Sequence, residues 1–269
     1  MELADCHLAM GDYGEAKKLY KAAVRTDAAD YTAQTALGAF YYSQKRFAEA
    51  ADPLQLVANL RPDSAKAQSN LGMVRWALGE MARAEAAFAE SLRLRPSRNA
   101  YNNRGLFWFY QGKFEASVAD FRHALEYAAE DPVIHGHLAD ALRNLPKYEA
   151  VALEIYLEAA ELAEKKLKVN KNDPRILVQL ARYKAHLGEA VDDILPLIDR
   201  ALELSPDRAD TYYIAALALI VLGDFDGARH NLSRAVELKY RANLILNEPD
   251  LIALADNPQI GPVLAKLKP

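Results

Sequence analysis

The side chains that could hold a metal ion are few and poorly grouped. His135 and His137 are two residues apart, so on a helix they point to nearly opposite sides, whereas His137 and Asp140, three apart, share a face. Two ligands do not complete a metal site, because zinc sites in proteins use at least three protein ligands. We therefore expect no metal and no other cofactor.

Nucleophilic and acid–base groups are equally sparse. Cys6 and His7 are adjacent, so their side chains diverge, and no third group is in place to orient the histidine. We expect both to pack in the core. Asp192 and Asp193 open a predicted helix, where acids suit the helix dipole. No glycine-rich loop is placed to cradle a phosphate, and we expect the protein not to be an enzyme.

The elements that must position any site repeat along the chain. Gly38, Gly72 and Gly105 are separated by 34 and 33 residues, and the frame continues at Ala139 and later at Ala216. A period of about 34 residues is typical of stacked helical hairpins. A small residue at this position lets the two helices of a hairpin approach closely.

Two further positions recur in the same frame. Glycine recurs at the turn between the helices, where a left-handed backbone ends the first helix; these are Gly11, Gly79, Gly112, Gly188 and Gly223. On each second helix a small residue is followed four later by a large apolar one, which predicts a buried stripe. The large members are Tyr20, Leu54, Phe88, Phe121 and Leu232.

These segments resemble the tetratricopeptide repeat. The match is carried by YTAQTALGAFYYSQKRFAEAADPLQLVANLRP, KAQSNLGMVRWALGEMARAEAAFAESLRLRP and YNNRGLFWFYQGKFEASVADFRHALEY. The resemblance implies an all-α fold, a right-handed α-solenoid of about seven hairpins with a C-terminal helical cap. The expected array covers residues 1–240 and the cap covers 241–269. The hairpins are expected at 1–30 (partial), 31–64, 65–97, 98–131, 132–173 (extended), 174–208 and 209–240.

Two departures from the period are informative. Between Ala139 and Ala181 the interval is 42 residues, which predicts a second helix lengthened by about two turns. After residue 240 the period stops, and apolar residues between Leu251 and Leu267 are expected to cover the last hairpin. This ending is also similar to repeat tails of bacterial signalling kinases and regulators. Because the first helix lacks about one turn, we expect a piece of a longer protein, unless the chain was cut to begin at Met1.

In this family the first helices line a concave groove, which implies candidate binding residues. The twelfth position of successive repeats reads Tyr42, Trp76 and Phe109, three aromatic side chains that either hold a ligand or pack against the next hairpin. Asparagines at this surface could bond a peptide backbone, and Arg143 could hold an acidic stretch or remain solvated. The candidate binding residues are Tyr42, Asn70, Trp76, Asn102, Asn103, Leu106, Phe109, Tyr110 and Arg143.

The expected function is a non-catalytic scaffold that binds a peptide or partner protein in this groove. The alternative is a regulatory, sensory or self-association tail of a larger bacterial signalling protein. The net charge of −4 argues against nucleic acid, and no apolar stretch is long enough to span a membrane. With a single cysteine and no visible signal peptide, we expect a cytoplasmic protein. Self-association remains open.

Overall fold

The computed structural model describes residues 2–268, apart from the side chain of Ala9, and contains no β-strand in that range. Contacts between residues divide the chain into two compact units, Met1–Asn103 and Arg104–Pro269. The boundary falls inside α7 (Arg98–Phe109). Within the described range, no helix has both the length and the apolar character needed to cross a bilayer.

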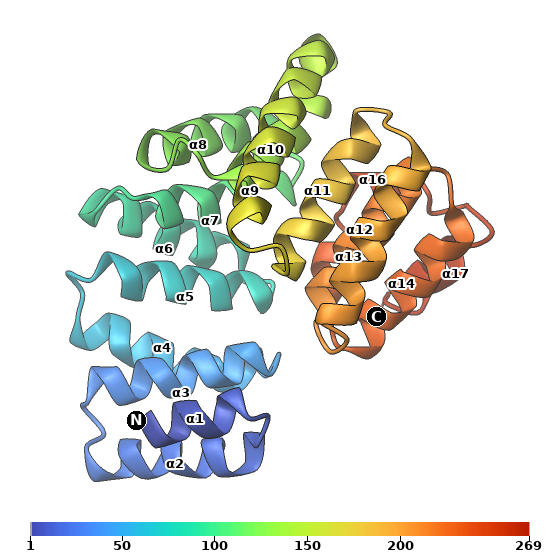
Figure 1. Ribbon diagram of the computed structural model, residues 1–269. Helices are drawn as coiled ribbons and strands as arrows, with labels where there is room; N and C mark the ends of the chain where they lie inside the picture. The colour runs from blue at the N-terminus through green and yellow to red at the C-terminus, as the bar shows by residue number, and fades with distance from the viewer. Residues whose placement is uncertain (1, 269) are drawn as a thin grey trace. The chain divides into compact units, whose positions relative to one another are not determined.

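Unit 1 consists of helical hairpins that stack in chain order (Figure 1). Each first helix pairs with the second helix of its hairpin, and α2 contacts α3 as α4 contacts α5. The helices of unit 1 before the boundary are α1 (Glu2–Ala9), α2 (Tyr13–Thr26), α3 (Tyr31–Ser43), α4 (Phe47–Leu60), α5 (Ala65–Ala77) and α6 (Met81–Leu94).

Unit 2 repeats this pattern and then departs from it. Its regular helices are α8 (Phe114–Tyr127), α9 (Pro132–Arg143), α10 (Glu149–Val169), α11 (Pro174–His186), α12 (Val191–Leu204), α13 (Ala209–Val221) and α14 (Phe225–Glu237), with a 3-10 turn, η1 (Pro146–Tyr148), before α10. Three short helices follow, α15 (Ala242–Ile245), α16 (Pro249–Ile252) and α17 (Gly261–Ala265). The longest, α10, has 21 residues against 14 in α8, which is about the two additional turns that the 42-residue interval predicts.

The recurring small residue permits close helix packing, as predicted. A Cβ atom placed on Gly72 would lie 2.7 Å from the Phe88 ring, so alanine would not fit unless that ring moved. Phe88 itself is fully buried, and its counterparts in the other repeats, Tyr20, Leu54, Phe121 and Leu232, are at most 3% exposed. The predicted apolar stripe on the second helices is therefore confirmed.

The turn glycines adopt the predicted left-handed backbone. Gly79 has φ of 77°, and all five turn glycines have positive φ. In the hairpin of α3 and α4 a lysine, Lys45, takes the same conformation with φ of 58°. The first helices α3, α5, α9 and α11 begin with side-chain caps, whereas α13 has none. Asp30, for example, accepts a hydrogen bond from the Thr32 amide at 2.8 Å.

The residues after 240 pack against the last hairpin. Leu251, Ile260, Val263 and Leu264 belong to the same buried cluster as residues of α13 and α14. Ile252, which the sequence also assigned to this cover, is 56% exposed.

At the other end of the chain, the prediction that Cys6 packs in the core is wrong, because Cys6 is exposed. Ala4 faces inward on α1, and a helix turns by about 200° over the two residues from Ala4 to Cys6.

Candidate functional site

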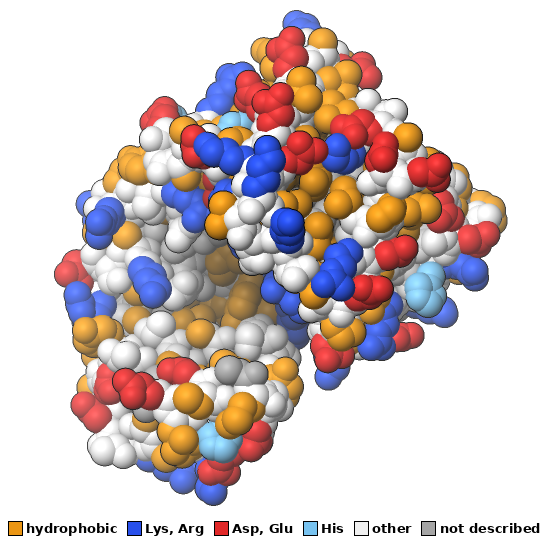
Figure 2. All heavy atoms as spheres, in the orientation of Figure 1, with side chains coloured by type: hydrophobic (Ala, Val, Ile, Leu, Met, Phe, Trp, Pro, Cys, Tyr) orange, Lys and Arg blue, Asp and Glu red, His pale blue; other side chains and the backbone are white. Residues whose placement is uncertain are grey.

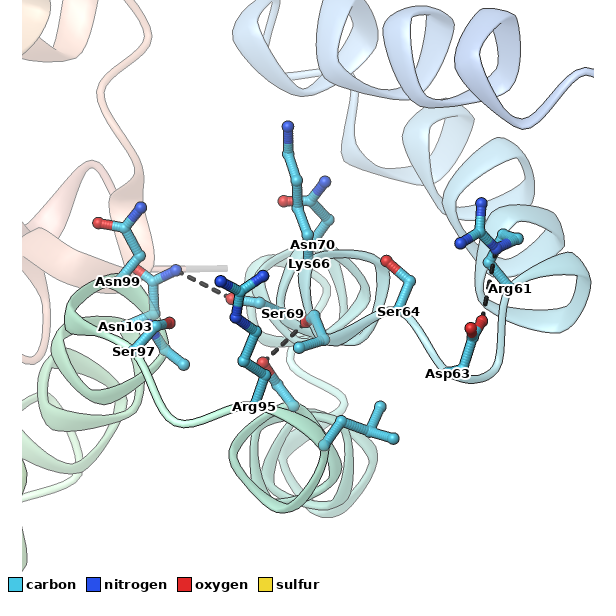
Figure 3. Close-up of a pocket in the computed structure, with 14 residues that line it drawn as sticks. Arg61, Asp63, Ser64, Lys66, Ser69, Asn70, Arg95, Ser97, Asn99 and Asn103 are labelled. Carbon is cyan, nitrogen blue, oxygen red and sulfur yellow. Dashed lines mark hydrogen bonds and ion pairs between the residues drawn. The ribbon is translucent and has the colours of Figure 1, made fainter.

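Two adjoining cavities lie in unit 1. The larger, about 700 Å³, lies between α5, the end of α6 and the start of α7, and we call it the basic pocket (Figure 3). The smaller, about 410 Å³, lies between α3 and α5, and we call it the side cavity. The two share Arg61, Ser64, Lys66 and Asn70 among their lining residues, so together they form one continuous groove in unit 1.

The polar lining of the basic pocket comes from three places in the repeat. The turn between α4 and α5 supplies Arg61, Asp63 and Ser64; α5 supplies Lys66, Ser69 and Asn70; and the residues from the end of α6 into α7 supply Ser91, Arg95, Ser97, Asn99 and Asn103. The predicted candidates Asn70 and Asn103 are both in this lining.

Positive charge exceeds negative charge in the basic pocket. Arg61 Nε lies 3.4 Å from Asp63 Oδ1, and the Arg61 guanidinium stacks over the Tyr31 ring at 4.8 Å. Lys66 and Arg95 pair with no carboxylate among the residues that the structure describes. On the face shown in Figure 2, basic and acidic side chains are intermixed. A lining with three cations and one carboxylate is therefore suited to an anionic ligand group.

Amide and hydroxyl groups complete the lining. Asn103 Nδ2 donates to Ser69 Oγ at 3.1 Å, and Ser91 Oγ donates to the Ala65 carbonyl at 2.8 Å, which joins α7 to α5 and α6 to α5 (Figure 3). These bonds fix the walls of the pocket. The Asn70 and Asn99 amides make no hydrogen bond within residues 2–268 and remain available to a ligand.

Trp76 and Phe109 do not line the groove. Their exposed fractions are 2% and 5%, so the expectation that both rings face a groove is corrected. Phe109 packs on Phe114, the first residue of α8, with ring centroids 5.6 Å apart. Tyr42, which is partly buried, makes the same contact with Phe47, the first residue of α4, at 5.2 Å. In these two hairpins the ring at the twelfth position therefore packs across the turn onto the first residue of the second helix. That these rings bind a ligand stays a prediction.

The other predicted candidates belong to unit 2 or lie outside both cavities. Asn102 is in unit 1 but lines neither cavity. Leu106 and Tyr110 belong to unit 2, where burial raises the pKa of Tyr110 well above its usual value and the negative charge of Glu248 adds to this. Arg143 Nη2 donates to both carboxylate oxygens of Asp250, at 2.8 and 2.9 Å. Arg143 is therefore held inside unit 2 by the chain itself.

A second polar group, which the sequence did not single out, lies inside unit 2. Arg182 of α11 donates to Asp140 of α9, and Tyr156 of α10 donates to the same carboxylate at 2.5 Å. Burial alone would raise the pKa of Asp140, but Arg182 outweighs it and lowers the pKa to about 2. The Tyr156 and His186 rings stack with centroids 4.4 Å apart.

The groups considered for metal or acid chemistry are not assembled in the structure. His137 packs against the Phe121 ring, and burial lowers its pKa to about 4. Asp192 and Asp193 lie in the first turn of α12. Among residues 2–268 no three His, Cys, Asp or Glu side chains are grouped so that they could hold a metal ion.

Arg61 and Arg95 were missed by the sequence analysis. Groove positions were sought on the first helices, whereas these two residues follow the second helices. A signal is present in the sequence, because each arginine directly precedes a repeat-closing proline, Pro62 or Pro96. A basic residue at the same place in two successive repeats predicts two cations on the same edge of the array.

Comparisons with known proteins agree with the helical-hairpin architecture. Sequence models described as tetratricopeptide repeat match residues 1–65, 54–99 and 98–130. No curated protein matches the sequence. A tetratricopeptide repeat protein from Parabacteroides merdae ATCC 43184 is 18% identical with a TM-score of 0.57, covering 99% of this chain and 96% of that one. The MamA structure is 21% identical with a TM-score of 0.55, covering 62% and 98%.

One chain of a larger assembly shares the same fold. In the structure of the APC/C hetero-tetramer Cut9–Hcn1, one chain aligns with a TM-score of 0.62 at 14% identity, covering 99% of this chain and 48% of that chain. At these identities the likeness shows the fold alone. The similarity of the tail to signalling kinases stays a prediction.

Proposed function

Because this chain is a tetratricopeptide repeat protein, we propose that it is a non-catalytic scaffold that binds an acidic, extended peptide of a partner protein in the groove of unit 1. The observation that carries the proposal is the pair Lys66 and Arg95. Both cations line a cavity of about 700 Å³ without a carboxylate partner among the described residues.

The chemistry of the basic pocket fits a carboxylate. Arginine presents a planar fork of donors that matches the two oxygens of a carboxylate, and lysine adds a compact charge. Arg61 is oriented over the Tyr31 ring, which limits the freedom that it would lose on binding. The Asn70 and Asn99 amides can donate to and accept from a peptide backbone beside the charged group.

The side cavity suits the next part of the same peptide. Its lining includes the small apolar residues Ala36 and Ala39 and the larger Tyr31 and Val57. An apolar ligand side chain would gain about 25 cal/mol for each Å² that it buries there. An acidic residue next to an apolar one in an extended peptide therefore matches the order of the two cavities.

The test is selection of a peptide-display library on the full chain, followed by fluorescence polarisation with the enriched peptides. We expect enrichment of acidic peptides. The double substitution Lys66→Ala and Arg95→Ala should weaken their binding by at least about 10-fold, since each charged contact contributes on the order of 1 kcal/mol.

The matched control removes the same two charge types from an exposed face of α2, with Lys21→Ala and Arg25→Ala. Neither residue lines the groove. The control should bind like the wild type. An equal loss in both double variants, or enrichment of basic peptides, would refute the proposal.

A further inference from the structure

The turn between α15 and α16, together with the start of α16, places two carboxylates inside unit 2. We call residues 247–250, Asn-Glu-Pro-Asp, the acidic turn. Glu248 is 2% exposed, and its Oε2 accepts a hydrogen bond from the Tyr213 hydroxyl at 2.8 Å. Asp250 accepts from Arg143 with both oxygens. The acidic turn is thus held by side chains from two helices that are distant in sequence.

The groups that receive the acidic turn come from successive first helices. Arg143 is on α9, Arg182 is on α11 and Tyr213 is on α13, and α11 contacts both α9 and α13. Arg182 pairs with Asp140, and its charge also acts on Glu248. We call Arg143, Arg182 and Tyr213 the carboxylate site. All three residues lie on first helices.

The carboxylates are not needed to cover the last hairpin. Ile245, Leu251 and Ile260 are fully buried against it and would exclude water by themselves. Burying charged groups carries a desolvation cost that apolar residues avoid. A segment whose only task was to cover the hairpin would therefore gain stability from apolar residues in place of Glu248 and Asp250.

The fit between the acidic turn and its site is also incomplete. Glu248 Oε1, Arg182 Nε and Arg143 Nε are buried and make no hydrogen bond to a described residue. Unsatisfied buried polar atoms are rare in proteins, and each weakens the structure that contains it. The site thus has donors that its present occupant does not use.

From this geometry we propose that the carboxylate site is a second peptide-binding site, and that it takes an acidic peptide whose two carboxylates are two residues apart. The acidic turn is its intramolecular occupant, which a partner peptide displaces. This inference is independent of the groove in unit 1, because all its residues lie in unit 2.

The probe is a labelled heptapeptide with the sequence of residues 246–252, LNEPDLI. Protein is added to it up to a concentration of roughly 1 mM. The full chain with Glu248→Gln and Asp250→Asn should bind it. The wild type should bind about 10-fold more weakly, because its own turn competes at an effective concentration on the order of millimolar. Adding Arg143→Ala to the double variant should abolish binding, and a peptide with Gln and Asn in place of the two acids should not bind.

Hydrogen exchange of the wild-type chain provides a second measurement that does not depend on the folding of a variant. Excess LNEPDLI should speed exchange of amides in residues 244–252 and leave α13 protected. The proposal is overturned if the peptide fails to bind a folded double variant, if wild type and variant bind equally, or if the peptide leaves exchange in residues 244–252 unchanged.

Discussion

Two pairs of cations, one pair in each unit, are held in opposite ways. In unit 1, Lys66 and Arg95 are exposed and have no carboxylate partner among the described residues. In unit 2, Arg143 and Arg182 each pair with a carboxylate of the same unit, and Arg182 is only 5% exposed. The same helical hairpin can thus present an exposed cation to a partner or bury a cation in an ion pair within the chain. The burial of the side chain decides between the two.

The largest contrast should appear when one arginine is removed from each unit. Arg182→Met leaves Asp140 buried without its partner and should lower the free energy of unfolding by about 3–5 kcal/mol. Arg95→Ala should change it little, because exposed charges away from special features contribute little to stability. Urea denaturation of both variants measures the difference.

A matched double variant sharpens this result. Asp140→Leu together with Arg182→Met removes both buried charges, so it should be more stable than Arg182→Met alone. Equal stability losses in Arg182→Met and Arg95→Ala would contradict the distinction between the two units.

The next effect in size is a pH dependence confined to unit 2. Burial raises the pKa of Glu248 to about 7 from an ordinary value of 4.5, so the folded chain keeps a proton there that the unfolded chain loses. The contribution of Glu248 to the free energy of unfolding therefore falls as pH rises from 4.5 to 7, by on the order of 3 kcal/mol in total. The charged or polar groups that act on Glu248 are Arg182, Asp250, Asp140 and Tyr213.

Comparison with Glu248→Gln isolates this contribution. The melting temperature of the wild type relative to the variant should drop between pH 5 and pH 8. His137 and His186, whose pKa values burial lowers to about 4 and about 3, are present in both proteins and cancel in the difference. Parallel pH profiles for the two proteins would show that Glu248 does not titrate in this range.

Salt should separate the two binding sites. Raising the ionic strength from about 0.1 M to about 1 M shortens the screening distance from about 10 Å to about 3 Å. Acidic peptides on the exposed basic pocket should then bind about 10-fold more weakly. LNEPDLI on the Glu248→Gln, Asp250→Asn chain should lose only about 2-fold, because buried pairs are screened less. If binding at the two sites depended equally on salt, the predicted difference in burial between the basic pocket and the carboxylate site would be contradicted.

The smallest effect is expected at an exposed ion pair of unit 1. Arg93 donates to both carboxylate oxygens of Glu90 at 2.7 Å on α6, and its side chain is 69% exposed. Arg93→Ala should leave the melting temperature unchanged within error, because solvent screens such pairs. A drop as large as that of Arg182→Met would show that this exposed pair matters as much as the buried Arg182–Asp140 pair.

The helical frame could be predicted because it depends on local rules. Position 72 requires glycine because of its contact with Phe88, and position 79 requires glycine because of its left-handed backbone. Small residues therefore recur at these positions with the period of the repeat. The length of α10 followed from the same count. These features depend on residues of a single hairpin, where spacing along the chain fixes proximity.

The sites were less predictable because they depend on distant residues. Arg143 meets Asp250 across 107 positions, and no local pattern links them. The basic pocket was found only in part: Asn70 and Asn103 follow the groove positions of the first helices, whereas Arg61 and Arg95 come from turns. Trp76 shows what the repeat spacing cannot predict. The spacing identified its position in the hairpin, but not that its side chain is only 2% exposed.

The aromatic closures of the hairpins have a consequence for folding kinetics. Tyr42 meets Phe47, and Phe109 meets Phe114, so each contact spans only five residues of the chain. Bringing such near neighbours together costs little loop-closure entropy, and proteins rich in local contacts fold in microseconds to milliseconds. These two hairpins can therefore close early in folding, before they pack against their neighbours.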